Sequence, residues 1–128
     1  MIRNGNYCIY NGREFELSED MDENLIIISE NPASLKEKGF IDRFNSGVYS
    51  KVVTPSELTK CYRIITKGKL DGKVVNISKE NGDEYYVGTP NAEVAKDLGA
   101  ERTDKYYYEK WVPKERIEIF EEIQEINL

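Results

Sequence analysis

The sequence predicts an α+β fold in which antiparallel strands alternate with short helices. Three observations lead to this prediction. Apolar runs of strand length recur along the chain, Asn-Gly and Asp-Gly pairs mark tight turns, and proline follows a helix-capping residue at several points. The 128 residues suit one compact domain, so we expect residues 1–128 to fold as a single unit.

An internal repeat is a further expectation. When the chain is shifted by sixty positions against itself, residues 12–39 align with residues 72–99. Five residues are identical in this window: Gly12/Gly72, Ser18/Ser78, Asn31/Asn91, Lys36/Lys96 and Gly39/Gly99. Five identities in twenty-eight positions are only a few above chance, so coincidence is the alternative. The prediction is two structurally similar halves, residues 1–66 and 67–128, packed as one unit.

The first half is expected to begin with a β-hairpin. Residues 7–10 have the composition of a strand and lead into Asn11 and Gly12. This pair tolerates the positive φ angles of a type I′ turn better than other residues do. Phe15 and Leu17 continue the alternation after the turn, and an acidic loop follows them.

A buried strand and a short helix are expected next. Residues 25–28 form a continuous apolar run of strand length. Asn31 and Pro32 are typical of a helix N-terminus, and Gly39 is typical of a left-handed C-cap. In that helix, Leu35 is the clearest candidate for a core contact.

The end of the first half allows two interpretations. We expect a strand over residues 48–53, followed by a capping box over residues 54–57. Four apolar residues then follow at helical spacing, which favours a helix: Leu58, Cys61, Tyr62 and Ile65. The alternative is a strand over residues 62–66, where β-branched residues are concentrated.

The second half repeats this order of elements. Asp71 and Gly72 predict a turn before strands over residues 73–78 and 84–87. Thr89-Pro90 is expected to cap a helix, and residues 106–112 to form a strand. The expected helix has Val94, Ala95 and Leu98 on its apolar face and ends at Gly99. A final helix is predicted over residues 114–127, with Ile119, Phe120, Ile123 and Ile126 on one stripe and Glu118, Glu121, Glu122 and Glu125 on the other face.

Composition argues against most catalytic classes. The chain has no histidine and two cysteines, which excludes histidine-based triads and leaves too few ligands for a zinc site. Asp20, Asp22 and Asn24 have the spacing of a calcium loop, but Leu25 stands where that loop needs glycine and Asn31 where it needs glutamate. Phosphate-binding glycine motifs are absent from the sequence. We therefore expect neither enzyme activity nor a cofactor or metal, although a pair of carboxylates acting in acid–base catalysis is an open alternative.

Charge and hydropathy limit the kinds of molecule that the protein is expected to bind. Twenty-four acidic and eighteen basic residues give a net charge of −6, which disfavours nucleic acid and anionic lipid. Neither a membrane-spanning run nor a signal-peptide pattern is present. Cys8 and Cys61 lie among apolar neighbours and are expected to be reduced core thiols. Together these features predict a cytoplasmic protein.

Aromatic and acidic side chains are the candidates for partner binding. In a strand over residues 106–112, alternation places Tyr106 and Tyr108 on one face and Tyr107 and Glu109 on the other. Exposed tyrosine and tryptophan commonly anchor protein interfaces, and acidic side chains can steer a cationic partner. The predicted binding residues are Tyr85, Tyr107, Glu109, Trp111, Glu118, Glu121, Glu122 and Glu125. The alternatives are half-buried strand aromatics and an acidic face that serves solubility.

This profile predicts a non-catalytic protein that binds another, basic protein. The most specific hypothesis is an immunity protein (antitoxin) that occludes a nuclease-like toxin, working as a monomer or homodimer. One alternative is a self-associating structural or assembly protein of a mobile element. Another is a small-ligand-binding domain or an unrecognised enzyme with a cleft between its halves.

Overall fold

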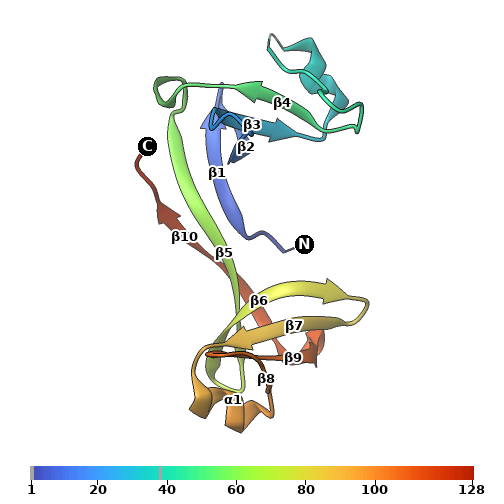
Figure 1. Cartoon of the computed structure of the whole chain (residues 1–128). Coiled ribbons are helices and arrows are strands. Elements are labelled where there is room, and N and C mark those ends of the chain that lie inside the picture. The colour runs from blue at the N-terminus through green and yellow to red at the C-terminus, as the bar shows by residue number, and fades with distance from the viewer. Residues whose placement is uncertain (1, 38) are drawn as a thin grey trace. The chain divides into compact units, whose positions relative to one another are not determined.

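The computed structural model describes residues 2–37 and 39–128, which form mainly antiparallel sheet. The elements of the first part are β1 (Gly5–Tyr10), β2 (Arg13–Glu19), β3 (Leu25–Ser29), η1 (Pro32–Lys36), β4 (Tyr49–Val52), η2 (Pro55–Glu57) and β5 (Lys60–Leu70) (Figure 1). The remaining elements are β6 (Lys73–Asn81), β7 (Glu84–Thr89), α1 (Ala92–Leu98), β8 (Glu101–Asp104), β9 (Tyr107–Pro113), η3 (Lys114–Arg116) and β10 (Glu118–Glu125). Each η element is a short 3₁₀ helix.

The chain divides into two compact units. Gly5–Ile64 and Ile123–Leu128 form the N-terminal unit, and Ile65–Glu122 with the residues before Gly5 form the C-terminal unit. Strands β5 and β10 each contribute residues to both units, and β10 pairs with β5. The structural similarity of the two halves stays a prediction.

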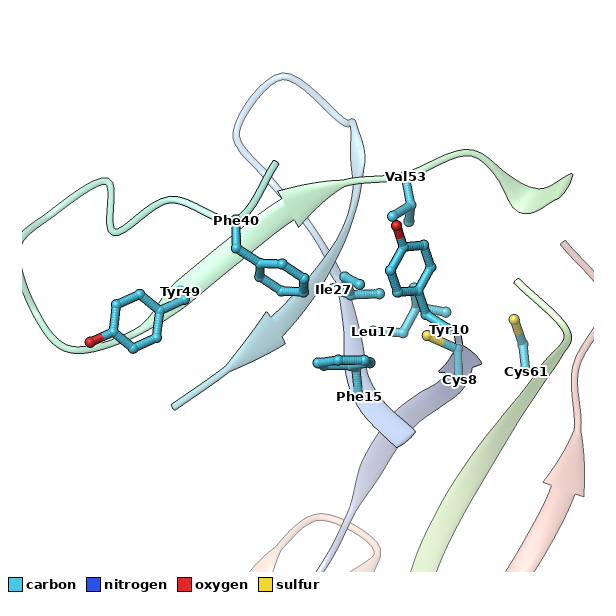
Figure 2. Packing of buried hydrophobic residues seen from close by; sticks show 9 residues of the cluster. All are labelled: Cys8, Tyr10, Phe15, Leu17, Ile27, Phe40, Tyr49, Val53 and Cys61. Atoms are coloured by element: carbon cyan, nitrogen blue, oxygen red, sulfur yellow. The ribbon is translucent and has the colours of Figure 1, made fainter. Parts of the chain in front are cut away.

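In the N-terminal unit, the strands follow the order β4-β3-β2-β1-β5. The β1–β2 hairpin turns at Asn11 and Gly12, whose φ angles are 50° and 75°, so the expected turn is confirmed. Alternate side chains of the strands point to one face and form the core, as Figure 2 shows. Its buried members are Cys8, Tyr10, Phe15, Leu17, Ile27, Phe40, Tyr49, Val53 and Cys61. Both cysteines are free and buried, as expected.

The helix expected after Asn31 is shorter than predicted. It is a single 3₁₀ segment, Pro32–Lys36, in which the N–H groups of Ser34 and Glu37 donate to the carbonyl three residues earlier. Asn31 caps it as expected, since its side chain accepts from the Ala33 N–H. The prediction that Leu35 is a core contact is wrong, because this short turn leaves it 52% exposed and buries Ser34 instead.

The prediction of a helix near residue 60 is also wrong. The capping box exists, with the Thr54 N–H donating to Glu57 Oε1 at 2.9 Å, but it starts only η2. Lys60–Leu70 is strand β5, in which Cys61 lies opposite Cys8 of β1. Pairing with β1 satisfies the backbone of β5, so the strand alternative is correct.

In the C-terminal unit, the strands follow the order β5-β6-β7-β9-β8. The turn at Asp71 and Gly72 is confirmed by φ angles of 52° and 78°. Asn91 caps α1 by accepting from the N–H groups of Glu93 and Val94, whereas Thr89-Pro90 had been expected as the cap. The core consists of Leu70, Val75, Ile77, Val87, Leu98 and Val112. In the described part of the chain the α-helix has seven residues and is too short to cross a membrane.

The final element differs most from the prediction. Glu118–Glu125 is strand β10, not a helix, and β8 was not predicted at all. In a strand, side chains alternate, so Glu118 and Glu122 take one face and Glu121 and Glu125 the other. The acidic helical face expected from the sequence therefore does not form. Helical spacing of the isoleucines was misleading because β-branched residues also suit a strand, and pairing with β5 decides between the two.

Candidate functional site

An apolar groove lies on the face of the β2–β3–β4 sheet that points away from the core. Its volume is about 650 Å³, within the range of ligand pockets. Ile26 and Ile28 form its floor because Ile27, between them, points into the core. Val52 of β4 lies directly opposite Ile26 and extends this floor.

Two loops form the walls of the groove. The loop after β2 contributes Met21, which is 90% exposed, and the segment before β4 contributes Phe44, which is 76% exposed. Ile41, in the same segment as Phe44, pairs with Ser50 of β4. Its N–H and C=O exchange hydrogen bonds of 2.9 Å with Ser50, which fixes the wall to the sheet edge.

The Met21 loop is held by an aspartate. Oδ1 of Asp20 accepts the backbone N–H groups of Asp22 and Asn24, both at 2.9 Å. The Asn24 side chain donates to Oδ2 at 3.1 Å. These hydrogen bonds, led by the Asn24 N–H, lower the pKa of Asp20 below its ordinary value, and the positive charge of Arg43 adds to the shift. The carboxylate of Asp20 thus orders its own loop.

The Phe44 loop is held in the same manner. The carboxylate of Asp42 accepts the N–H groups of Ser46 and Gly47, each at 2.9 Å. The Gly47 and Ser46 hydrogen bonds lower the pKa of Asp42. Two exposed apolar side chains, Met21 and Phe44, are therefore presented on loops with a defined conformation.

The predicted aromatic anchors lie on both faces of the β7–β9 pair, with Tyr107 and Trp111 on one face and Tyr85 on the other. Tyr85 lies opposite Val112 and packs against the core of the C-terminal unit, with Lys114 Nζ 5.0 Å from its ring centre. Trp111 lies opposite Tyr86, with ring centres 4.8 Å apart, and is 37% exposed. Since neighbouring strand positions alternate, Tyr85 and Trp111 face opposite sides of the sheet.

Two further predicted residues have contacts within the C-terminal unit. The ring of Tyr107 lies over Gly88, where an added Cβ would overlap it, and its hydroxyl accepts a hydrogen bond from Asn76 Nδ2 at 3.2 Å. Glu109 accepts a hydrogen bond from the Thr103 hydroxyl. These contacts explain why Tyr107 and Glu109 are only partly exposed.

Two of the predicted acidic residues are already paired. Glu121 receives two hydrogen bonds from the guanidinium of Arg3, at 2.9 and 3.1 Å, and these lower its pKa. Glu122 lies 2.8 Å from Lys67 Nζ. Glu118 and Glu125 are exposed. Of the predicted site residues, Tyr107, Glu109 and Trp111 therefore share one face of β9, where Glu109 and Trp111 line the same small pocket. Tyr85 lies on the other face of the β7–β9 pair, and the acidic residues of β10 are divided between its two faces.

Unlike Glu121 and Glu122, the carboxylates beside the groove are not in ion pairs with other described residues. Glu16 lies opposite Ile28 on the groove face, and Glu19 lines the groove. Within residues 2–37 and 39–128, the side chains of Glu16, Glu19, Asp22 and Glu23 form no ion pair or hydrogen bond. No three described side chains are arranged as metal ligands. The groove thus combines an apolar floor with acidic groups that are open to a partner.

The groove was not predicted from the sequence. Its floor follows from the β3 alternation, but its walls come from segments that the sequence marks only as polar loops. The signal that could have found them is an apolar residue inside each loop, Met21 between acids and Phe44 after Asp42 and Arg43.

Comparison with known proteins identifies a family. A family described as "Uncharacterised conserved protein UCP033725" matches residues 2–128. The chain belongs to this family. No curated protein and no solved structure matched it.

Proposed function

We propose that this protein acts by binding another protein. The observation that carries the proposal is the display of Met21 and Phe44 on loops ordered by Asp20 and Asp42 around an apolar groove. Exposed apolar groups rimmed by polar residues are typical of interaction sites. Pre-ordered loops also reduce the entropy lost on association.

The specific function that we propose is that of an immunity protein or antitoxin. The net charge of −6 would attract a cationic toxin such as a nuclease, and a protein that covers the toxin's basic substrate site needs contact area rather than reactive groups. The groove offers such contact area. The carboxylate of Asp20 beside it is not a free reactive group, because it accepts hydrogen bonds from the backbone of its own loop. We place this activity in the cytoplasm, where Cys8 and Cys61 would stay reduced.

Capture of a partner on the immobilised chain tests this proposal. The wild-type chain should retain one cationic protein that is released as salt rises, and Phe44→Ser should retain much less of it. Equal retention by the variant would place binding elsewhere. Growth of oligomers with concentration, measured by sedimentation, would favour self-association instead.

We also propose that the two halves arose by duplication. Each contains a turn with two positive φ angles, at Asn11-Gly12 and Asp71-Gly72, and a later turn or helix capped by asparagine, at Asn31 or Asn91. Superposition of residues 13–36 on residues 73–96 in a crystal structure tests this. Strands that cannot be superposed in the same order and direction would argue against duplication.

A further inference from the structure

We propose that the groove of the N-terminal unit binds an amphipathic, cationic segment of the partner protein. Apolar side chains of that segment would occupy the groove floor, and its lysine or arginine side chains would lie beside the carboxylates of β2 and the following loop. This inference rests on the proposed function and specifies the chemistry of the partner at this surface.

The groove exposes apolar side chains that a partner could cover. Ile26, Ile28 and Val52 form a continuous floor across two strands. Met21 and Phe44 stand above it with most of their surface in contact with solvent. Covering these side chains would remove apolar area from water, which favours association by about 25 cal/mol for each Å².

Carboxylates beside the groove form no ion pair with the residues that the structure describes. Glu16 lies on the groove face opposite Ile28, and Glu19 lines the groove at the end of β2. Glu121 and Glu122, in contrast, are already paired with Arg3 and Lys67. Carboxylates without partners lose less on meeting a cation, because no existing ion pair must break.

Two basic side chains near the groove do not cancel its negative charge. Lys51 lies at the groove, but its ammonium group contacts the hydroxyl and ring of Tyr10. Arg43 also lines the groove, and it lies close enough to Asp20 to lower the pKa of that carboxyl. Beside these two cations, the carboxylates of Glu16, Glu19, Asp22 and Glu23 form no ion pair within residues 2–37 and 39–128, so the β2 side keeps an excess of negative charge.

Charge also disfavours two other occupants. The sequence of the N-terminal unit contains eleven acidic and seven basic residues, so a second copy docking on the same face would bring like charges together. Phosphate-bearing ligands would meet the same carboxylates. A cationic segment with apolar side chains matches both properties of the surface.

The test is calorimetric titration of the full chain with two synthetic peptides of equal length. One is an amphipathic leucine–lysine peptide, and the other is its leucine–glutamate counterpart. We expect the lysine peptide to bind with an affinity that falls as salt rises, and the glutamate peptide to show no binding. Equal binding of the two peptides, or binding of neither, would overturn the inference.

Variants then locate the binding surface. Glu16→Lys with Glu19→Lys should weaken the lysine peptide about tenfold or more, and so should Phe44→Ser. The matched control, Glu115→Lys with Glu118→Lys, makes the same change of charge in the C-terminal unit and should weaken it far less. Equal losses in the reversal and the control would show binding by net charge alone and would overturn the inference. Thermal unfolding of each variant confirms that it is folded.

The same variants separate this inference from the proposed function. If a captured partner depends on Phe44 but tolerates reversal of Glu16 and Glu19, the protein-binding function holds and the cationic segment is wrong. If no protein is captured and Phe44→Ser has no effect on any ligand, the proposed function itself fails.

Discussion

The contrast between Phe15 and Phe44 yields the most direct test of the structure. Phe15 is 7% exposed and packs against Tyr10 and Phe40, with ring centres 6.2 and 5.5 Å away. Phe44 is 76% exposed at the groove. Truncating a buried phenylalanine to alanine lowers the free energy of unfolding by about 3–5 kcal/mol, whereas exposed positions change it by about 0.5 kcal/mol or less.

We therefore expect Phe15→Ala to lose about 3–5 kcal/mol and Phe44→Ala to stay within about 0.5 kcal/mol of the wild type. Urea unfolding, followed by far-ultraviolet circular dichroism, measures both values. A loss of that size takes up much of a typical domain's stability, so Phe15→Leu provides a milder second variant. A loss above about 1 kcal/mol for Phe44→Ala would show that Phe44 is buried and would refute its role as a displayed contact.

Three further predictions concern packing, protonation and thiol reactivity. Gly88→Ala should lower the free energy of unfolding by about 1–3 kcal/mol because the added methyl overlaps Tyr107, and Tyr107→Leu should reduce that loss in thermal melts. The pKa values of Asp20 and Asp42 are lowered, so the two loops should be fully ordered above the ordinary aspartate pKa of 3.8 and lose this order as pH falls through the lowered values. Amide NMR shifts of both loops during an acid titration measure this loss, and Asp42→Asn serves as the control. Burial raises the pKa of Cys8 to about 12, so a disulfide reagent should modify this thiol only after urea unfolding, and rapid modification in the native protein would contradict its burial.

The tight turns and the Asn31 cap were predicted correctly from local sequence, whereas elements that depend on distant strand pairing were not. Asn11-Gly12 and Asn31 act within a few residues, so their turn and cap could be predicted. Cys61 and Ile65 fit helical spacing as well as a strand, and only pairing with β1, more than fifty residues away, decides for the strand. The same ambiguity produced the wrong helix at β10.

The candidate site was harder to predict for the same reason. Glu121 is separated from Arg3 by 118 residues, so the sequence could not reveal that this acid is paired. The groove walls come from loops around Met21 and Phe44 that are brought together by the folded sheet. Exposed apolar residues in polar loops carry little information until their neighbours are known.

The pairing of β5 with β10 has a consequence for synthesis on the ribosome. The N–H of Ile126 donates to the carbonyl of Cys61 at 3.0 Å, so part of β5 obtains its partner only when the last strand has emerged. About fifty residues separate the two strands, which at roughly 5–20 residues per second is a delay of about 2.5–10 s. During this delay an edge of β5 is open to chaperones, and a product truncated before Glu118 would keep that edge unpaired and prone to aggregation.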